Sequence, residues 1–202
     1  GARRCLPSGV CGHGYICIIG SSGTNYVINL LSDQPLTLNL ASQSLASSAL
    51  SNTPILNFAN INEARSTTSN KELIAWNQNN NWQMTADDAG RLEYAVRDAD
   101  SGLTVESVEF VFSNFNRLMG GALADTFNVD NFAVTDTIDG RAGDDIFNLR
   151  GDTAFVQTLI GGDNSDTLYG HNLFANNWLI VGNNAGSVEG LGTGFTEIEN
   201  LI

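Results

Sequence analysis

Three short stretches of this chain share one pattern: GGALADTFN at positions 120–128, GRAGDDIFN at 140–148 and GGDNSDTLY at 161–169. Each stretch opens on a glycine, has an aspartate at its sixth position and places a large apolar residue at its eighth. An apolar residue also stands two positions before each glycine, and its spacing of 20 or 21 residues continues down the chain: Leu118, Ile138, Leu159, Ile180 and Leu201. A fixed period of this length is typical of stacked structural repeats.

The pattern predicts the backbone path through one repeat. Glycine and asparagine form a corner, aspartate braces the corner through backbone amides, and a short strand follows. Because neighbouring side chains of a strand point to opposite sides, Phe127, Phe147 and Leu168 should stack inside the protein, one repeat apart. We therefore predict an all-β fold, mainly a right-handed parallel β-helix (β-solenoid) with coils of about 20 residues.

The repeat divides the chain into three expected parts. Residues 112–202 hold the regular repeats, and residues 25–111 form an irregular β-solenoid with an inserted loop near 95–107. The 20-residue spacing of Ile16, Leu36 and Leu56 supports this irregular part, although the glycine corners are missing there. Residues 1–24 form an N-terminal segment or cap.

Cys5, Cys11 and Cys17 all lie in this N-terminal segment. An odd number of cysteines allows at most one internal disulfide and a spare thiol. One disulfide of a secreted protein, small buried hydrophobes, and a Cys3His zinc site with His13 are the alternatives.

The composition excludes several classes of partner. The net charge is −13 and the pI is about 4.2, so the surface repels nucleic acid and anionic membranes. No apolar run approaches the length of a membrane span, so we expect no membrane insertion. The chain opens in GARR and stops within a repeat, which indicates continuation into a longer parent polypeptide.

Several segments carry a resemblance to known proteins: FTEIENLI at 195–202, DGRAGDDIF at 139–147, and the Asn-Trp and Ala-Gly pairs at 81–90 and 177–186. They resemble large repetitive bacterial surface proteins, a group that includes filamentous haemagglutinin-like exoproteins and giant adhesins. This resemblance implies a secreted, cell-surface, parallel β-helix segment of an adhesin, acting in attachment and virulence. Its implied partner is a glycan or protein receptor on a host or another cell.

The glycine bends are also similar to the nonapeptide G-G-x-G-x-D-x-U-x of calcium-binding RTX proteins. This chain departs from that nonapeptide, because Leu123 and Asn164 replace the fourth glycine and Arg141 replaces the second. The bends also stand alone, whereas RTX nonapeptides occur in tandem. A calcium-dependent, RTX-like binding module is therefore an alternative function.

Aspartates of successive repeats are the candidate metal ligands. Asp125, Asp145 and Asp166 should stack about one strand spacing apart, where like charges repel by on the order of 3 kcal/mol at an effective dielectric near 20. Either a cation such as calcium (Ca2+) or several amide donors must offset this repulsion. Asp144 and Asp163 stand close by to supply further oxygen ligands. The alternative is that each aspartate only braces its own corner.

Catalysis has little support in the sequence, and we expect no enzyme. His13 and His171 are the only histidines, and no motif such as G-x-S-x-G accompanies them. A carbohydrate-active β-helix enzyme is the remaining alternative; its nearest carboxylate pairs, at 87–88 and 98/100, both fall in predicted bends. Trp76, beside asparagine and glutamine, is the candidate sugar-stacking residue, whereas Trp82 and Trp178 occupy matched positions that favour the core.

Overall fold

The computed structural model describes residues 16–20, 26–30, 35–47, 54–57, 61–68, 70–97, 104–172 and 175–202. Every regular element in these ranges is a β-strand, so the prediction of an all-β fold is confirmed. The same ranges contain no helix, and hence none able to span a membrane. Cys5, Cys11 and His13 lie outside the described residues.

The strands form two sheets of ten strands each. The first sheet has, in order, β1 (Ile16–Gly20), β2 (Tyr26–Leu30), β6 (Ile61–Ser66), β10 (Thr104–Ser113), β9 (Ala89–Arg97), β8 (Asn80–Ala86), β12 (Thr126–Asn128), β14 (Ile146–Asn148), β16 (Thr167–Tyr169) and β20 (Asn200–Leu201). The second sheet has, in order, β17 (Leu179–Gly182), β18 (Ala185–Ser187), β19 (Leu191–Thr196), β15 (Phe155–Asp163), β13 (Ala133–Ala142), β11 (Arg117–Met119), β7 (Lys71–Ile74), β3 (Leu36–Asn39), β4 (Ser44–Ser47) and β5 (Pro54–Asn57).

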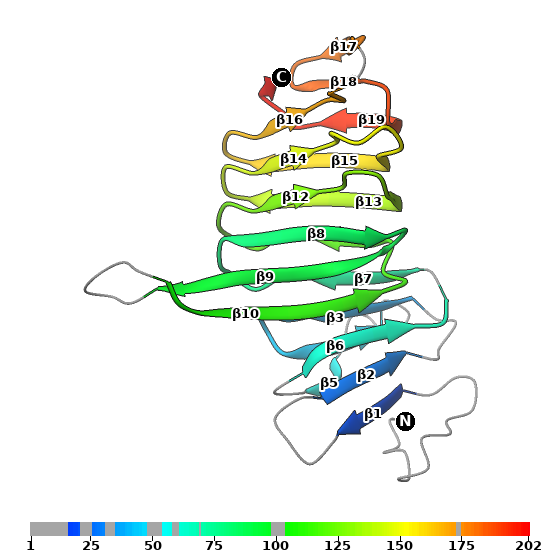
Figure 1. Cartoon of the computed structure of the whole chain (residues 1–202), viewed down its shortest axis with the longest axis vertical. Coiled ribbons are helices and arrows are strands. Elements are labelled where there is room, and N and C mark those ends of the chain that lie inside the picture. Colours follow the sequence, from blue (N-terminus) through cyan, green and yellow to red (C-terminus); the bar gives the residue numbers. More distant parts are fainter. Residues whose placement is uncertain are drawn as a thin grey trace.

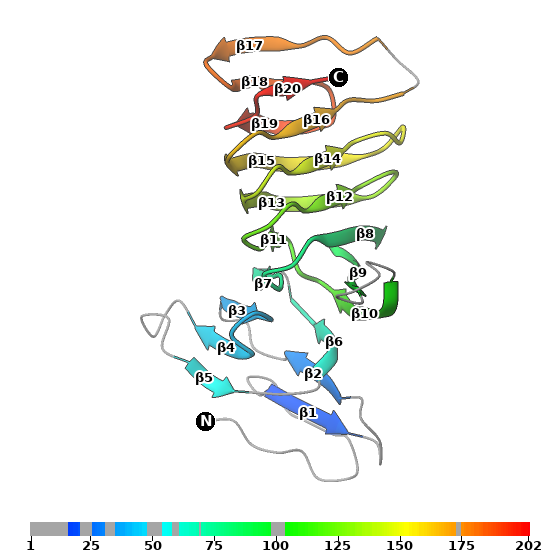
Figure 2. The ribbon, with the colours of Figure 1, turned by 90° about the vertical axis from the view of Figure 1, so that its left-hand side faces the viewer.

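From β11 to β16 the chain passes alternately between the two sheets. β11, β13 and β15 pair in parallel in the second sheet, and β12, β14 and β16 pair in parallel in the first. Figures 1 and 2 show the strands stacked one above another along the long axis of the molecule. Each passage through both sheets uses one repeat of 20 or 21 residues.

Other strands pair antiparallel, so both sheets are mixed. These pairs are β1 with β2, β8 with β9, β9 with β10, and the two groups β3–β4–β5 and β17–β18–β19. The hairpin of β9 and β10 extends sideways beyond its neighbours (Figure 1). The predicted insertion at 95–107 falls on its distal part, of which residues 98–103 are outside the described ranges.

The apolar ladder of the sequence forms one wall of the core. Leu118 pairs with Ile138, and Ile138 with Leu159, as predicted, and all three side chains are buried. The ladder also runs backwards through Leu73 to Leu38, two residues that the 20-residue spacing does not reach.

The next two members of the predicted ladder were placed wrongly. Ile180 lies exposed in β17, and Leu201 pairs with Leu168 in the other sheet. Phe195 is the residue that pairs with Leu159. The hairpin of β17 and β18 explains the error, because it lengthens this interval to 36 residues.

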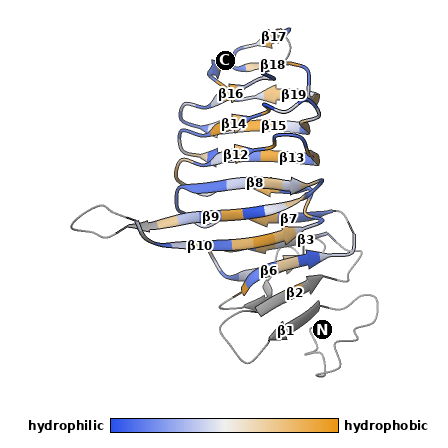
Figure 3. Cartoon of the chain, in the orientation of Figure 1, coloured by the Kyte–Doolittle hydropathy of each residue, from blue (hydrophilic) through white to orange (hydrophobic). Residues whose placement is uncertain are grey.

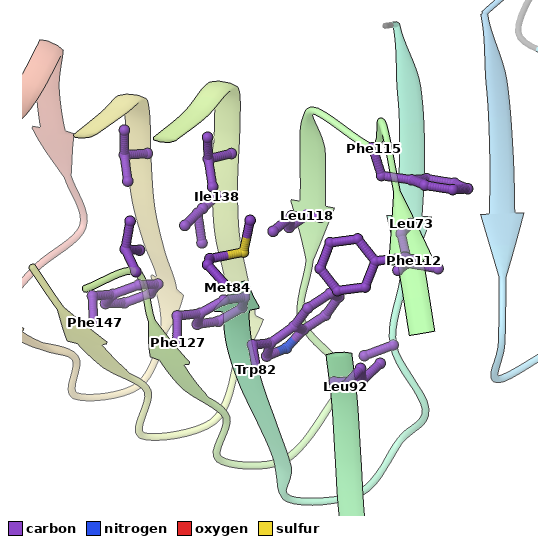
Figure 4. Packing of buried hydrophobic residues seen from close by; sticks show 14 of the residues in the cluster. Leu73, Trp82, Met84, Leu92, Phe112, Phe115, Leu118, Phe127, Ile138 and Phe147 are labelled. Carbon is purple, nitrogen blue, oxygen red and sulfur yellow. The ribbon is translucent and has the colours of Figure 1, made fainter. Parts of the chain in front are cut away.

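The opposite wall of the core is an aromatic stack. Phe127 pairs with Phe147, and Phe147 with Leu168, which confirms the predicted inner stack. The rings of Phe127 and Phe147 lie 5.2 Å apart at 8°, and the ring of Trp82 continues the stack at 5.2 Å from Phe127 (Figure 4). Trp82 is fully buried, while Trp178 is partly buried against Phe195.

The first third of the chain does not follow the predicted spacing. Leu36 pairs with Ser47 and Lys71, and Leu56 pairs with Leu45, so Ile16, Leu36 and Leu56 form no common ladder. Antiparallel pairs, β1 with β2 and β3–β4–β5, are found here in place of the parallel pairing of the later repeats.

Candidate functional site

The corner after β11, β13 and β15 is the part of the repeat that carries charge. In the second and third bends the fourth residue has a left-handed backbone, with φ of +125° at Gly143 and +90° at Asn164. Glycine and asparagine tolerate this conformation better than other residues, which explains their recurrence there. The bend returns the chain to the first sheet and places the following aspartate inside the corner.

These aspartates and one glutamate form a continuous hydrogen-bonded column, which we call the carboxylate ladder: Asp125, Asp145, Asp166 and Glu199. The N–H of Asp125 donates to Oδ1 of Asp145 at 2.6 Å, and the N–H of Asp145 donates to Oδ1 of Asp166 at 2.8 Å. The N–H of Asp166 donates to Oε2 of Glu199 at 2.7 Å. Each carboxylate therefore joins its own repeat to the preceding one.

The glycine that opens each bend makes room for this ladder. A Cβ atom on Gly140 would collide with Oδ2 of Asp145 and with the carbonyl oxygen of Gly161. A Cβ atom on Gly120 would meet Asp125 and Gly140 in the same way. The glycine five residues before the aspartate is therefore needed for the close packing of the backbone against the carboxylate, as well as for the turn.

The three aspartates of the ladder lie in a poorly solvated, acidic environment. Asp145 is 0% exposed, and burial, followed by the nearby charges of Asp125, Asp166 and Asp139, raises its pKa to about 8. Burial also raises the pKa of Asp125 and of Asp166 to about 6 each. Because desolvation disfavours the charged form, the raised pKa favours a protonated Asp145 at neutral pH.

Two oxygens of the ladder stand out chemically. Oδ2 of Asp145 and Oδ2 of Asp166 are buried and receive no hydrogen bond. Oδ2 of Asp125, in contrast, accepts from the N–H of Gly121 at 2.6 Å. A buried carboxylate oxygen without a donor is costly, so a proton, a cation or a bound water would stabilise these two positions.

The five predicted metal residues are only partly brought together. Asp125, Asp145 and Asp166 share the ladder, whereas Asp144 and Asp163 are exposed. Oδ1 of Asp144 accepts from the N–H of Ser165 at 3.1 Å. In the described part of the chain, no three acidic, histidine or cysteine side chains converge in a way that could hold a metal ion. Amide donors occupy both oxygens of Asp125 and one oxygen each of Asp145 and Asp166, so calcium binding stays a prediction.

The sequence reasoning missed both ends of the ladder. At its start, Asn80 donates from its backbone N–H and its Nδ2 to Oδ1 of Asp125, at 2.8 and 2.7 Å. Asn80 follows Leu73 by seven residues, as Asp125 follows Leu118, so this spacing could have revealed it. Glu199 at the other end follows Phe195 by only four residues, and its longer side chain reaches the same position.

Asp87 and Asp88, one of the two carboxylate pairs of the enzyme alternative, bind the backbone of a neighbouring strand. Asp87 accepts from the N–H of Ala133 at 2.9 Å. Asp88 accepts from the N–H and the hydroxyl of Thr135, at 2.7 and 2.6 Å. Both carboxylates therefore hold the start of β13 in place, which is a structural role.

Trp76 packs against both strands of the β9–β10 hairpin. Its ring is partly buried and makes edge-to-face contacts with Tyr94 at 5.0 Å and Phe110 at 6.2 Å. The predicted sugar-stacking residue thus belongs to an aromatic cluster and offers only part of its ring to solvent.

The outer side of the first sheet carries a column of amides. Nδ2 of Asn128 donates to Oδ1 of Asn81, and Nδ2 of Asn148 donates to Oδ1 of Asn128, both at 2.9 Å. In the next row stands Tyr169, whose ring lies 4.6 Å from the Arg150 guanidinium. This amide column was not predicted, although the repeated asparagine at the ninth position of two bends could have indicated it.

No protein-family model matches this chain, and no curated protein or solved structure is significantly similar to it.

Proposed function

We propose that this chain is a structural and adhesive segment of a secreted bacterial cell-surface adhesin. In this proposal the chain winds as a right-handed parallel β-helix with coils of about 20 residues. The stacked coils form a rod whose exposed faces attach to a glycan or protein receptor on a host or another cell. The role is mechanical display and binding, without catalysis.

The register of the inner walls is the observation that carries the proposal. Leu118, Ile138 and Leu159 follow one another in parallel pairs on one wall, and the aromatic stack does the same on the other. One repeat per layer is the arrangement expected of a solenoid, in which each repeat contacts only its neighbours. Such an extended body suits display of a binding face away from a cell surface.

The outer face supports attachment to sugars. Asn81 and Asn128 of the amide column are partly exposed, while Asn148 is buried, and amide groups can both donate and accept hydrogen bonds with hydroxyls. Figure 3 shows hydrophilic and hydrophobic residues intermixed along the strands of the stack, with hydrophilic bends between them. Tyr169 and the partly exposed ring of Trp76 add aromatic surfaces of the kind that stack on sugars.

Binding of the labelled chain to a glycan array and to cultured host cells tests this function. We expect binding that Tyr169→Ala or Trp76→Phe reduces at least several-fold, while circular dichroism and thermal stability stay close to wild type. Leu123→Ala, which removes an exposed apolar side chain from a bend, is the matched control. Absence of binding to every glycan and cell type would overturn the adhesive role.

The shape is tested independently of binding. Small-angle scattering should give an elongated particle, and a crystal structure should show right-handed coils. A compact particle or left-handed coils would contradict the proposed β-helix while leaving the binding result unaffected.

A calcium-dependent binding module is a second candidate function, favoured by the unpartnered Oδ2 atoms of Asp145 and Asp166. Calcium would supply the positive charge that these buried oxygens lack. This candidate requires that a chelator lower the thermal unfolding midpoint by more than a few degrees, and that Asp145→Asn remove the effect. An unchanged midpoint would leave protons as the partners of these oxygens.

A further inference from the structure

One column of side chains on the outer side of the first sheet crosses five successive strands. Arg91 of β9 pairs with Gln83 of β8, and Gln83 pairs with Asn128 of β12. Asn128 pairs with Asn148 of β14, and Asn148 with Tyr169 of β16. Figure 1 shows these strands in this order along the long axis. The column points away from the core, because the sequence neighbours of its members are buried there: Leu92, Trp82, Met84, Phe127, Phe147 and Leu168. We call this column, together with Arg150, the outer strip.

The middle of the outer strip consists of amides that the protein holds in place. Nε2 of Gln83 donates to Oδ2 of Asp130 at 2.8 Å, and Nδ2 of Asn148 donates to Oδ1 of Asn128 at 2.9 Å. Gln83 and Asn128 are partly exposed, while Asn148 is buried. Amides fixed in this way lose little side-chain freedom when a ligand binds, which favours recognition of hydroxyl groups.

An arginine stands at each end of these amides. Arg91 is exposed at one end. Arg150 is exposed at the other end, where its guanidinium lies 4.6 Å from the ring centre of Tyr169. In the described part of the chain, neither arginine has a carboxylate within ion-pair distance. Although the net charge of the chain is −13, both guanidinium groups therefore have N–H donors free for an external anion.

The separation of the two arginines indicates an extended ligand. Arg91 lies on β9, and Arg150 follows two residues after the end of β14. These strands are three strand spacings apart in the sheet, which corresponds to roughly 14 Å along the stack. A single sugar ring cannot reach from one arginine to the other, whereas a short oligosaccharide can do so and also cover the amides between them. The ring of Tyr169 adds an aromatic surface beside the same path.

The charge of the chain indicates the kind of anion. A guanidinium can donate two parallel hydrogen bonds to a planar carboxylate. The net charge of −13 repels a densely charged ligand, such as a sulfated polysaccharide, more strongly than a ligand with at most one carboxylate on each sugar. Asp130, which is bound to Gln83, adds a negative charge beside the outer strip. A carboxylated sugar chain of low charge density is therefore the better match.

We propose that the outer strip binds an extended oligosaccharide that carries carboxylate groups and lies along the long axis of the stack. Arg91 and Arg150 bind carboxylates of this ligand, and the amides between them bind its hydroxyl groups. The inference rests on the proposed attachment to sugars, and it names the class of sugar. An acidic peptide offers carboxylates as well, but it lacks the rows of hydroxyl groups that the amides match.

Isothermal titration calorimetry with three oligosaccharides of equal length tests the proposal. The first is built from uronic acid residues, the second is its carboxyl-reduced neutral form, and the third is that neutral form after sulfation. We expect the uronic acid form to bind about tenfold more tightly than the other two, because only it offers carboxylates to both arginines. Arg91→Gln and Arg150→Gln should each weaken its binding several-fold and leave the affinity for the neutral form unchanged. Arg141→Gln makes the same charge change on an exposed arginine outside the outer strip and should have no effect.

Several results would overturn the proposal. Equal affinity for the uronic acid and neutral forms would exclude a role of the carboxylates and leave the adhesive role standing. Tighter binding of the sulfated form, or equally strong binding of a glutamate oligomer, would exclude the proposed ligand class. An equal effect of Arg141→Gln would show that net charge controls binding. If none of the three oligosaccharides binds, the inference is wrong, and the glycan array and the cell assay decide the adhesive role separately. Circular dichroism of each variant verifies that it is folded.

Discussion

The backbone N–H of Asp125 donates a 2.6 Å hydrogen bond to Oδ1 of Asp145, which stands 20 residues further along the chain. This bond joins one layer of the stack to the next from inside the corner. A glycine at the head of the second bend is needed for it, because any Cβ atom at Gly140 would occupy the space of the Asp145 carboxylate. The repeat spacing, the glycine corner and the buried carboxylate therefore depend on one another: the spacing aligns the two aspartates, and the glycine leaves room for the carboxylate.

Stability should fall as the pH rises from about 4 to about 8. Burial raises the pKa of Asp145 to about 8 and those of Asp125 and Asp166 to about 6, above the ordinary value of 3.8. In this window the folded chain binds more protons than the unfolded chain, so the stabilising contribution is complete below pH 4 and is lost through the folded pKa values. Urea unfolding at pH 4.5, 6, 7.5 and 8.5 measures this slope, and a midpoint that rises with pH would contradict it.

Asp145→Asn should flatten this pH dependence. An asparagine can still accept the Asp125 N–H through Oδ1, and it has no proton to lose at the buried position. We expect the variant to be at least as stable as wild type at pH 8 and to show a smaller loss of stability between pH 4 and 8. Asp163→Asn changes an exposed acid and should leave the slope as it is. An unflattened slope in Asp145→Asn would mean that protons are held elsewhere.

Gly140→Ala should destabilise the stack. The added methyl group collides with the Asp145 carboxylate and with the Gly161 backbone, and overpacking of this kind costs about 1–3 kcal/mol or more. Gly182→Ala is the matched control, since its Cβ atom would meet only the Ala185 side chain, at 3.8 Å. Chemical denaturation gives both free energies of unfolding. Equal effects of the two substitutions would show that the close approach at Gly140 is unimportant.

Trp82→Ala should remove the first ring of the aromatic stack. The side chain is buried and lies 5.2 Å from Phe127 and 5.8 Å from Phe112. Truncation of a buried tryptophan costs about 3–5 kcal/mol, because it leaves a cavity. Leu123→Ala, on an exposed side chain, should change the free energy of unfolding by less than about 0.5 kcal/mol. A small effect at Trp82 would place the stability of the chain outside this stack.

The sequence alone determined the strands between Leu118 and Tyr169. In each repeat, glycine is needed at the corner and apolar residues are needed in the core, so these residue types recur at a fixed spacing. That spacing predicted the pairings of Leu118, Ile138 and Leu159. Asp125, Asp145 and Asp166 followed from the same spacing as neighbours in one column.

Only the tertiary structure decided where the period is interrupted. The sequence predicted part of the β9–β10 insertion, at 95–107, but the 21-residue spacing continued through Ile180 and gave no sign of the β17–β18 hairpin. The insertions moved Ile180 to an exposed edge, gave its expected position to Phe195 and brought in Asn80 and Glu199 as the ends of the carboxylate ladder. Strand pairing joins residues that are distant along the chain, and an insertion between two paired strands does not change the residue pattern within either strand. The local spacing therefore cannot predict the length of such an insertion.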